Sequence, residues 1–200
     1  MAQEKVARFR DERYWGRPVP GFGDPAARLL VLGLAPAAHG GNRTGRVFTG
    51  DASGDFLFPV LHAAGLASSP ISRRADDGMT MRDAYIAAAV RCAPPDNKPT
   101  IEERDTCAPY LVRELELLPG VRVILALGAF GWDAGLRTLA ALGHRATGPR
   151  PRFGHGAEAR VGPYAVIGSY HPSQQNTFTG RLTAPMFRAV VDRAIALAAV

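Results

Sequence analysis

Four runs of consecutive apolar residues alternate along this chain with longer stretches that have helical periodicity. The runs are RLLVLGLAP at 28–36, AYIAAAVRC at 84–92, VRVILALGA at 121–129 and PYAVIGSYHPS at 163–173. Strands of a parallel sheet that is covered on both faces form nearly continuous apolar runs of this kind. The alternation therefore predicts an α/β fold: a three-layer α/β/α sandwich around a central, mostly parallel four-stranded sheet.

Helix-like segments follow each of the four runs. The expected helices cover 54–66, 100–118, 130–143 and 183–199. Pro59 fits the first turn of the first helix, and Thr100 with Glu103 forms the capping box that starts the second. The segment 150–162 has room for one short additional strand.

The length, composition and charge of the chain indicate its size class, its location and the kind of partner it binds. The chain has 200 residues, 46% of them hydrophobic, and we expect a single domain over residues 1–200. No apolar run reaches the roughly 18 residues that cross a bilayer, and the charged N-terminus lacks a signal peptide, so we expect a cytoplasmic protein with no membrane partner. The net charge of +6 comes mainly from arginine, which favours a polyanionic partner, although a GC-rich genome produces the same bias.

The loop after the first run, GLAPAAHGGNRTGRVFTGDASGDF at 33–56, is rich in glycine and polar residues. It has neither a Walker A nor a dinucleotide-binding pattern. Backbone amides near Gly33 can bind an anion or a carbonyl oxygen, and the Phe48 ring can stack on a planar ligand. Arg43 and Arg46 are predicted to contact phosphates. The alternative is a structural turn with Phe48 packed beneath it.

Further polar groups follow the second and fourth runs. Asn97 lies between two prolines, and its side-chain amide offers a donor and an acceptor that can read the edge of a base, although a plain turn asparagine is the alternative. His171 can donate to a developing oxyanion or can be structural. The residues after it that suit phosphate contacts are Ser173, Gln174, Gln175, Asn176 and Arg181. We expect these loops to converge at the carboxyl ends of the strands.

Five motifs occur together in this chain. They are YWGRPVPGFGDP, GLAPAAHGGNRTGRVFTGD, RCAPPDNKPT, CAPYL and HPSQQNTFTGRLT. This combination, which extends from Tyr14 to the final helix, resembles the type 5 uracil-DNA glycosylases of the uracil-DNA glycosylase superfamily. The resemblance implies an enzyme that hydrolyses the N-glycosidic bond of uracil, and of other deaminated bases such as hypoxanthine, in single- or double-stranded DNA. The alternative to an enzyme is a damage-recognising DNA-binding module without turnover. In either case we expect a monomer.

The resemblance also implies roles for individual residues. The target base leaves the stack, and the segment 171–181 wedges into the duplex to hold the gap. His171 stabilises the negative charge on O2 of the departing uracil, and Asn97 binds the Watson–Crick edge of the base. The groups that contact the base are Gly33, Leu34, Ala35, Ala37, Phe48 and Asn97.

The residue that positions the attacking water is less obvious. Related families carry a polar residue in the first motif, but here that segment reads GLAPAA. Asp51 is the predicted catalytic helper and Asp55 is the second candidate. Either carboxylate could instead cap the helix that follows.

Two cysteines bear on a possible cofactor. Type 4 and type 5 members hold a [4Fe–4S] cluster on four cysteines, and Cys92 and Cys107 match two of those positions as candidate ligands. The resemblance places the other two in an N-terminal cysteine-bearing segment ahead of YWGRP, where this sequence has no cysteine. We expect either that this segment is missing because the chain is shortened at its start, or that this member lacks an intact cluster. We therefore expect the cluster to be absent or incomplete. Cys107 also shares a helical stripe with Leu111 and Leu115, which is typical of a core position.

Overall fold

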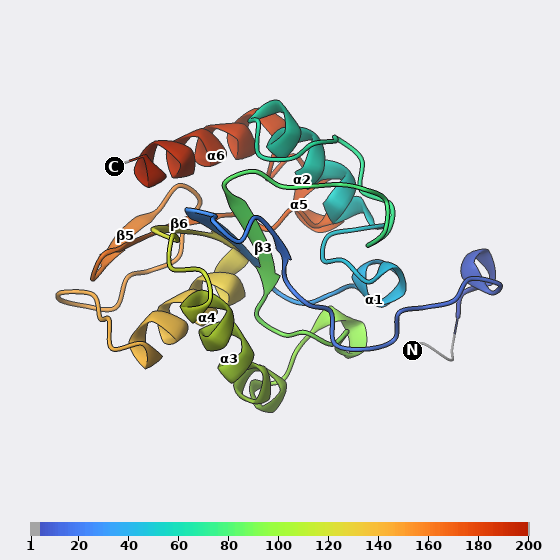
Figure 1. Ribbon diagram of the computed structural model, residues 1–200, viewed down its shortest axis with the longest axis horizontal. Coiled ribbons are helices and arrows are strands. Elements are labelled where there is room, and N and C mark those ends of the chain that lie inside the picture. The colour runs from blue at the N-terminus through green and yellow to red at the C-terminus, as the bar shows by residue number, and fades with distance from the viewer. Residues whose placement is uncertain (1–4, 200) are drawn as a thin grey trace.

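The computed structural model describes residues 5–199. A sheet lies at its centre, between the long helices (Figure 1). The sheet has six strands in the order β1-β3-β2-β4-β6-β5. The four apolar runs form its parallel strands, β2 (Leu29–Gly33), β3 (Ala84–Ala88), β4 (Val123–Leu127) and β6 (Tyr164–Ser169). The structure confirms the predicted α/β class and the mostly parallel sheet.

Two antiparallel strands form the edges, so the sheet has six strands rather than the predicted four. β1 (Phe22–Gly23) pairs with β3, and β5 (Glu158–Val161) pairs with β6. β1 contains only two residues, and β5 alternates exposed with more buried residues. Neither edge strand has the continuous apolar run that identifies a strand covered on both faces. β5 lies inside the segment 150–162, where an additional strand was expected.

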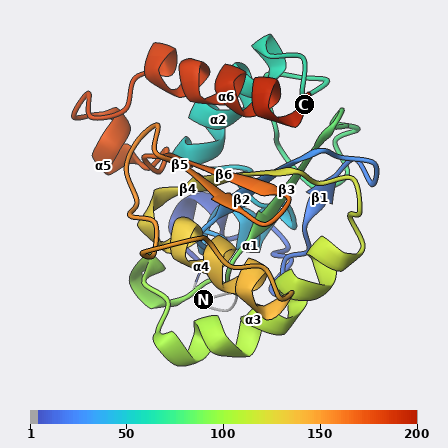
Figure 2. The ribbon, with the colours of Figure 1, turned by 90° about the vertical axis from the view of Figure 1, so that its left-hand side faces the viewer.

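Helices cover both faces of the sheet (Figure 2). α2 (Ala52–Ala63) and α6 (Ala184–Ala198) pack together on one face. α3 (Ile101–Glu116) and α4 (Gly128–Ala141) cover the other. The three predicted layers are therefore present. Among the described residues, no helix combines the length and the apolar character needed to cross a bilayer.

The local signals at two helices can be checked directly. The amide of Glu103 donates to Thr100 Oγ1 at 3.1 Å, and the amide of Thr100 donates to Glu103 Oε2 at 2.7 Å, which confirms the capping box. Pro59 lies in the second half of α2, not in its first turn as predicted.

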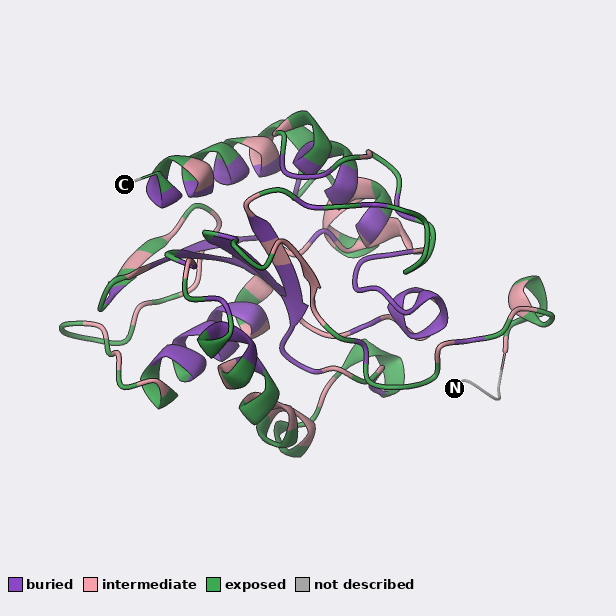
Figure 3. Ribbon diagram, in the orientation of Figure 1, coloured by how far each residue is buried: buried purple, intermediate pink, exposed green. Residues whose placement is uncertain are grey.

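Short elements occupy the loops at the carboxyl ends of the strands. α1 (Gly41–Thr44) follows β2, α5 (Gln174–Thr177) follows β6, and a 3-10 turn (Pro95–Asn97) follows β3; another 3-10 turn lies at Ala7–Phe9. The long helices are buried where they face the sheet and exposed on the outside, whereas all four residues of α1 are buried (Figure 3). The glycine-rich loop after β2 therefore runs through the interior rather than over the surface.

Candidate active site

A cavity of about 760 Å³ lies where the parallel strands end. The loops after β2, β3 and β6 form its walls, together with the start of α4 and Phe153. Most of the side chains that were predicted to act on a ligand line it: Leu34, Ala35, Ala37, Phe48, Asp51, Asn97, His171, Ser173, Gln174, Gln175, Asn176 and Arg181. Segments far apart in the sequence meet here because parallel strands share one carboxyl edge.

Phe48 forms part of the cavity wall and packs against the end of β2. A Cβ atom added at Gly33 would lie 2.5 Å from Phe48 Cζ, so only glycine leaves room for the ring. Gly33 thus supports Phe48 and is not itself part of the wall. The Phe48 backbone has a φ of 51°, which is uncommon for a residue with a side chain. Phe48 is 9% exposed, and this remaining surface faces the cavity, where a planar ligand can stack.

His171 approaches Phe48 from the loop after β6. The two ring centroids are 5.8 Å apart, with the rings tilted by 36°. Burial lowers the pKa of His171 to about 4, so the imidazole is neutral at pH 7. A neutral imidazole still carries one N–H, which can donate to an oxygen in the cavity.

The neighbours of His171 hold it in place. The side chain of Asn176 donates to the His171 carbonyl at 2.9 Å. The preceding residue, Tyr170, stacks on His155 with ring centroids 5.0 Å apart, and its amide donates to His155 Nδ1 at 3.2 Å. The guanidinium of Arg181 lies 4.6 Å from the centre of the Tyr170 ring. The backbone that carries His171 is therefore fixed from both sides.

Asn97 reaches the cavity from the loop after β3. Asp96 and Asn97 both have positive φ values, 51° and 54°, which short polar side chains tolerate better than most residues. The turn leaves Asn97 exposed and on the cavity lining. Its amide is therefore available to a ligand.

Comparison of the sequence with those of known proteins identifies the family. Residues 20–194 match the sequence profile of the Uracil DNA glycosylase superfamily. The chain belongs to this superfamily. A type-5 uracil-DNA glycosylase of Mycobacterium bovis is 52% identical over 202 residues, which cover 100% of this chain and 74% of the relative. One from Thermus thermophilus is 56% identical over 191 residues, 95% of this chain and 84% of the relative.

A type-4 uracil-DNA glycosylase of Archaeoglobus fulgidus is less similar, at 37% identity over 113 residues, 56% of this chain and 49% of the relative. The longer and closer matches place the chain in the type-5 family, as its motifs indicate.

Asp51 caps α2 in this type-5 family member and also lines the cavity. Its Oδ1 atom accepts from the Gly54 amide at 3.0 Å, which confirms the capping alternative. Burial raises the pKa of Asp51, and the amides of Gly54 and Ser53 oppose that shift only in part. A carboxylate with a raised pKa is a stronger base. The second candidate, Asp55, is exposed and does not line this cavity.

The prediction that Arg46 contacts DNA phosphates is wrong. Its side chain is 2% exposed and donates to Ser72, Asp77 and the carbonyl of Ala75. A guanidinium with these partners is a structural cation that has no path to a phosphate.

Arg43 is likewise bound inside the protein, contrary to the prediction. It is 8% exposed and donates to Glu12 Oε2 at 2.6 Å and to the carbonyls of His39 and Gly50. The sequence places both arginines in a polar loop, but α1 folds that loop into the interior.

The residues present do not form a complete iron–sulfur site. Cys92 is exposed and Cys107 is half-buried. Burial, and then the nearby Cys107 thiol, raise the pKa of Cys92, which disfavours the thiolate that binds metal. Within residues 5–199, no group of three or more His, Cys, Asp or Glu side chains could hold a metal ion. Two thiols supply half of the ligands of a [4Fe–4S] cluster.

Sequence reasoning did not single out several residues near the cavity. Tyr170 and Phe153 line it, and Phe178, at the end of α5, is 77% exposed. An aromatic residue in a polar loop was the signal used for Phe48. The same signal, applied to 150–157 and 171–181, would have found Phe153 and Phe178.

Proposed function

We propose that this type-5 family member hydrolyses the N-glycosidic bond of a uracil that has been flipped out of DNA, leaving an abasic site. The observation that carries the proposal is that Phe48, Asn97 and His171, from three separate loops, line one cavity. Its volume of about 760 Å³ is in the range of small-molecule sites. The family resemblance implies hypoxanthine as a second substrate.

Each side chain has a role in this reaction. Phe48 stacks on the base, and the Asn97 amide binds its Watson–Crick edge. The neutral imidazole of His171 donates to uracil O2 as the bond between C1′ and N1 breaks and its electron pair moves onto the base. Water then attacks C1′ of the sugar cation, and its proton passes to the Asp51 carboxylate. Uracil departs as an anion and is protonated in solvent.

A strand-cleavage assay tests the function. The protein is incubated with an end-labelled duplex that contains one uracil and is then treated with alkali, which breaks the strand at an abasic site. We expect cleavage at the uracil position and none in the matched duplex with thymine. Binding without cleavage would instead support the DNA-binding module as the function.

Replacing Asp51 with asparagine separates its two possible roles. Asparagine caps helices nearly as well as aspartate, so we expect little change in melting temperature. The loss of the base should lower the single-turnover rate about 100-fold or more. The matched change Asp55→Asn should leave the rate unchanged. A full rate in Asp51→Asn would restrict Asp51 to capping.

Phe178 is the apolar side chain that we propose to wedge into the duplex. It lies at the end of α5, whose residues Gln174 and Gln175 line the cavity. Replacing Phe178 with serine should lower kcat/KM on duplex DNA about tenfold and leave single-stranded DNA nearly unaffected, because only the duplex must be unstacked. Leu117→Ser, an equally apolar change at a side chain 60% exposed at the end of α3, is the control. An equal loss on both substrates would argue against a wedge.

A further inference from the structure

A second groove adjoins the cavity beside the start of α2. It has a volume of about 680 Å³ and shares Asp51, Ala52 and Gln174 with the cavity lining. At its other side it shares Arg43 and Arg74 with a hollow of about 560 Å³ next to Tyr14 and Trp15. The hollow therefore adjoins the groove, and the groove adjoins the cavity; we call the groove and the hollow together the track.

The track is predominantly basic. Its two parts are lined by Arg8, Arg13, Arg17, Arg43, Arg73 and Arg74, against the carboxylates Glu12, Asp51 and Asp55. Glu12 is occupied by Arg43 and lies 3.8 Å from Arg74, which is itself 3.5 Å from Asp76. Arg73 is exposed and has no carboxylate partner among residues 5–199. The same holds for Arg8, Arg13 and Arg17. These four guanidinium groups are available to an anion.

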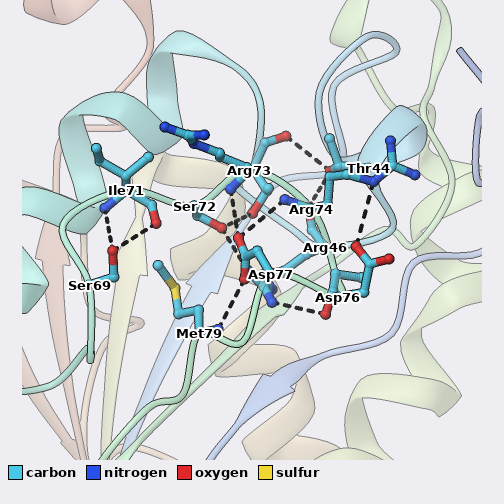
Figure 4. A network of polar contacts seen from close by, with 12 residues as sticks. Thr44, Arg46, Ser69, Ile71, Ser72, Arg73, Arg74, Asp76, Asp77 and Met79 are labelled. Carbon is cyan, nitrogen blue, oxygen red and sulfur yellow. Dashed lines mark hydrogen bonds and ion pairs between the residues drawn. The ribbon is translucent and has the colours of Figure 1, made fainter.

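A buried ion pair fixes the segment that carries Arg73 (Figure 4). Arg46 Nη1 lies 2.8 Å from Asp77 Oδ1, with its side chain only 2% exposed. Asp77 also accepts from the backbone amides of Arg73 at 2.7 Å, Arg74 at 3.2 Å and Met79 at 3.0 Å. Burial alone would raise the pKa of Asp77, but these donors lower it to about 2. The Asp77 carboxylate thus holds the backbone of the segment 73–79 in place.

In the segment 69–79 some side chains are buried and others are exposed to solvent. Ser72 points inward, where its hydroxyl lies 2.7 Å from Thr49 Oγ1 and 2.8 Å from Arg46 Nη1. Ser72 is buried at the wall of the groove, whereas Ile71, 56% exposed, and Arg73, also exposed, present their side chains to solvent there. Thr49 directly follows Phe48, so the same network supports the base-stacking ring and the outer basic surface.

We propose that this track binds the sugar–phosphate backbone of the DNA strand on one side of the flipped nucleotide, with Arg73 as a phosphate contact and Ile71 against a sugar. The inference rests on the proposed function, because it requires a nucleotide in the cavity. A strand that enters the cavity past Asp51 and Gln174 continues directly into the groove. Arginine forks bind phosphate oxygens well, and the contacts carry no sequence information, as repair at any sequence demands.

The double variant R73Q/R74Q tests the track. The control is R82Q/R145Q, which removes the same charge from two exposed arginines before β3 and after α4, at the opposite end of the sheet. Binding is measured against salt concentration on a duplex with 2′-fluoro-2′-deoxyuridine, in which the fluorine blocks cleavage. The slope of log K against log salt should fall by about 1 for R73Q/R74Q, roughly 0.9 for the phosphate that Arg73 no longer neutralises, and by much less for the control.

The side of the contact is tested with shortened substrates. Uracil is placed near the 5′ end or near the 3′ end of an oligonucleotide, and KM is compared between wild type and variant. We expect wild type and variant to have the same KM when uracil lies near one of the two ends, and different KM values when it lies near the other. kcat should be unchanged within about twofold on both substrates. Equal losses at both ends, or an equal loss in the control, would overturn the proposal. The change at Arg74 also removes its contacts with Glu12 and Asp76. If that loss shifts the melting temperature of the double variant, the same measurements are repeated with R73Q alone. Wild-type cleavage tests the enzymatic function separately.

Discussion

Replacing His171 with alanine is expected to lower the single-turnover rate of uracil release by a factor of about 100–1,000, with DNA affinity nearly unchanged. The loss is that of one preorganised donor to the developing oxyanion. In the proposed complex His171 contacts the base only, so the phosphate contacts that dominate affinity stay intact. The measurement is single-turnover cleavage of a uracil duplex beside binding of the uncleavable analogue. His171→Gln, which keeps an N–H donor, should recover part of the rate. An unchanged rate in His171→Ala would remove the assigned role.

The protonation state of His171 gives this prediction a pH dependence. With a folded-state pKa of about 4, the imidazole stays neutral from pH 6 to 8, so its titration leaves the rate flat there. A cationic donor with an ordinary pKa of about 6.5 would make the rate rise as the pH falls. Between pH 6.5 and 4 the unfolded chain binds a proton that the native His171 does not, so the free energy of unfolding falls as the pH is lowered. His171→Gln should lose that slope.

Replacing Asp77 with asparagine is expected to lower the free energy of unfolding by about 3 kcal/mol, because it leaves the Arg46 cation buried without its carboxylate. Chemical denaturation measures the loss. Asp76→Asn, one residue away with a side chain 84% exposed, is the control and should have little effect. The double variant Arg46→Met, Asp77→Asn should recover part of the stability, since no unpaired charge remains. A small effect in Asp77→Asn alone would mean that water solvates the guanidinium.

Local signals in the sequence were enough to predict the architecture. Each parallel strand is an apolar run, and the capping box of Thr100 and Glu103 marks the start of α3 from neighbouring residues alone. Together with the shared carboxyl edge of parallel strands, these signals bring Phe48, Asn97 and His171 to one cavity without any knowledge of long-range contacts.

The two arginines of the first loop show where this reasoning fails. Arg43 and Arg46 stand among glycines and polar residues, which is typical of an exposed loop. Their partners, Glu12 and Asp77, are both distant in the sequence. No local pattern announces such a pair, so residues that neutralise each other in the fold look like free charges in the sequence. Arg73, by contrast, has two aspartates, Asp76 and Asp77, close by in the sequence, yet its guanidinium pairs with neither and is exposed.

Gly33 also determines how freely this chain can diverge. It contributes no side chain to the chemistry, but any larger residue there would displace the Phe48 ring by taking its space. Substitution at 33 therefore requires a simultaneous, smaller residue at 48, which would abolish the stacking surface. A single substitution at this pair therefore cannot reshape the proposed base site, and a change of base specificity is expected instead from other lining residues, such as Asn97 and Phe153.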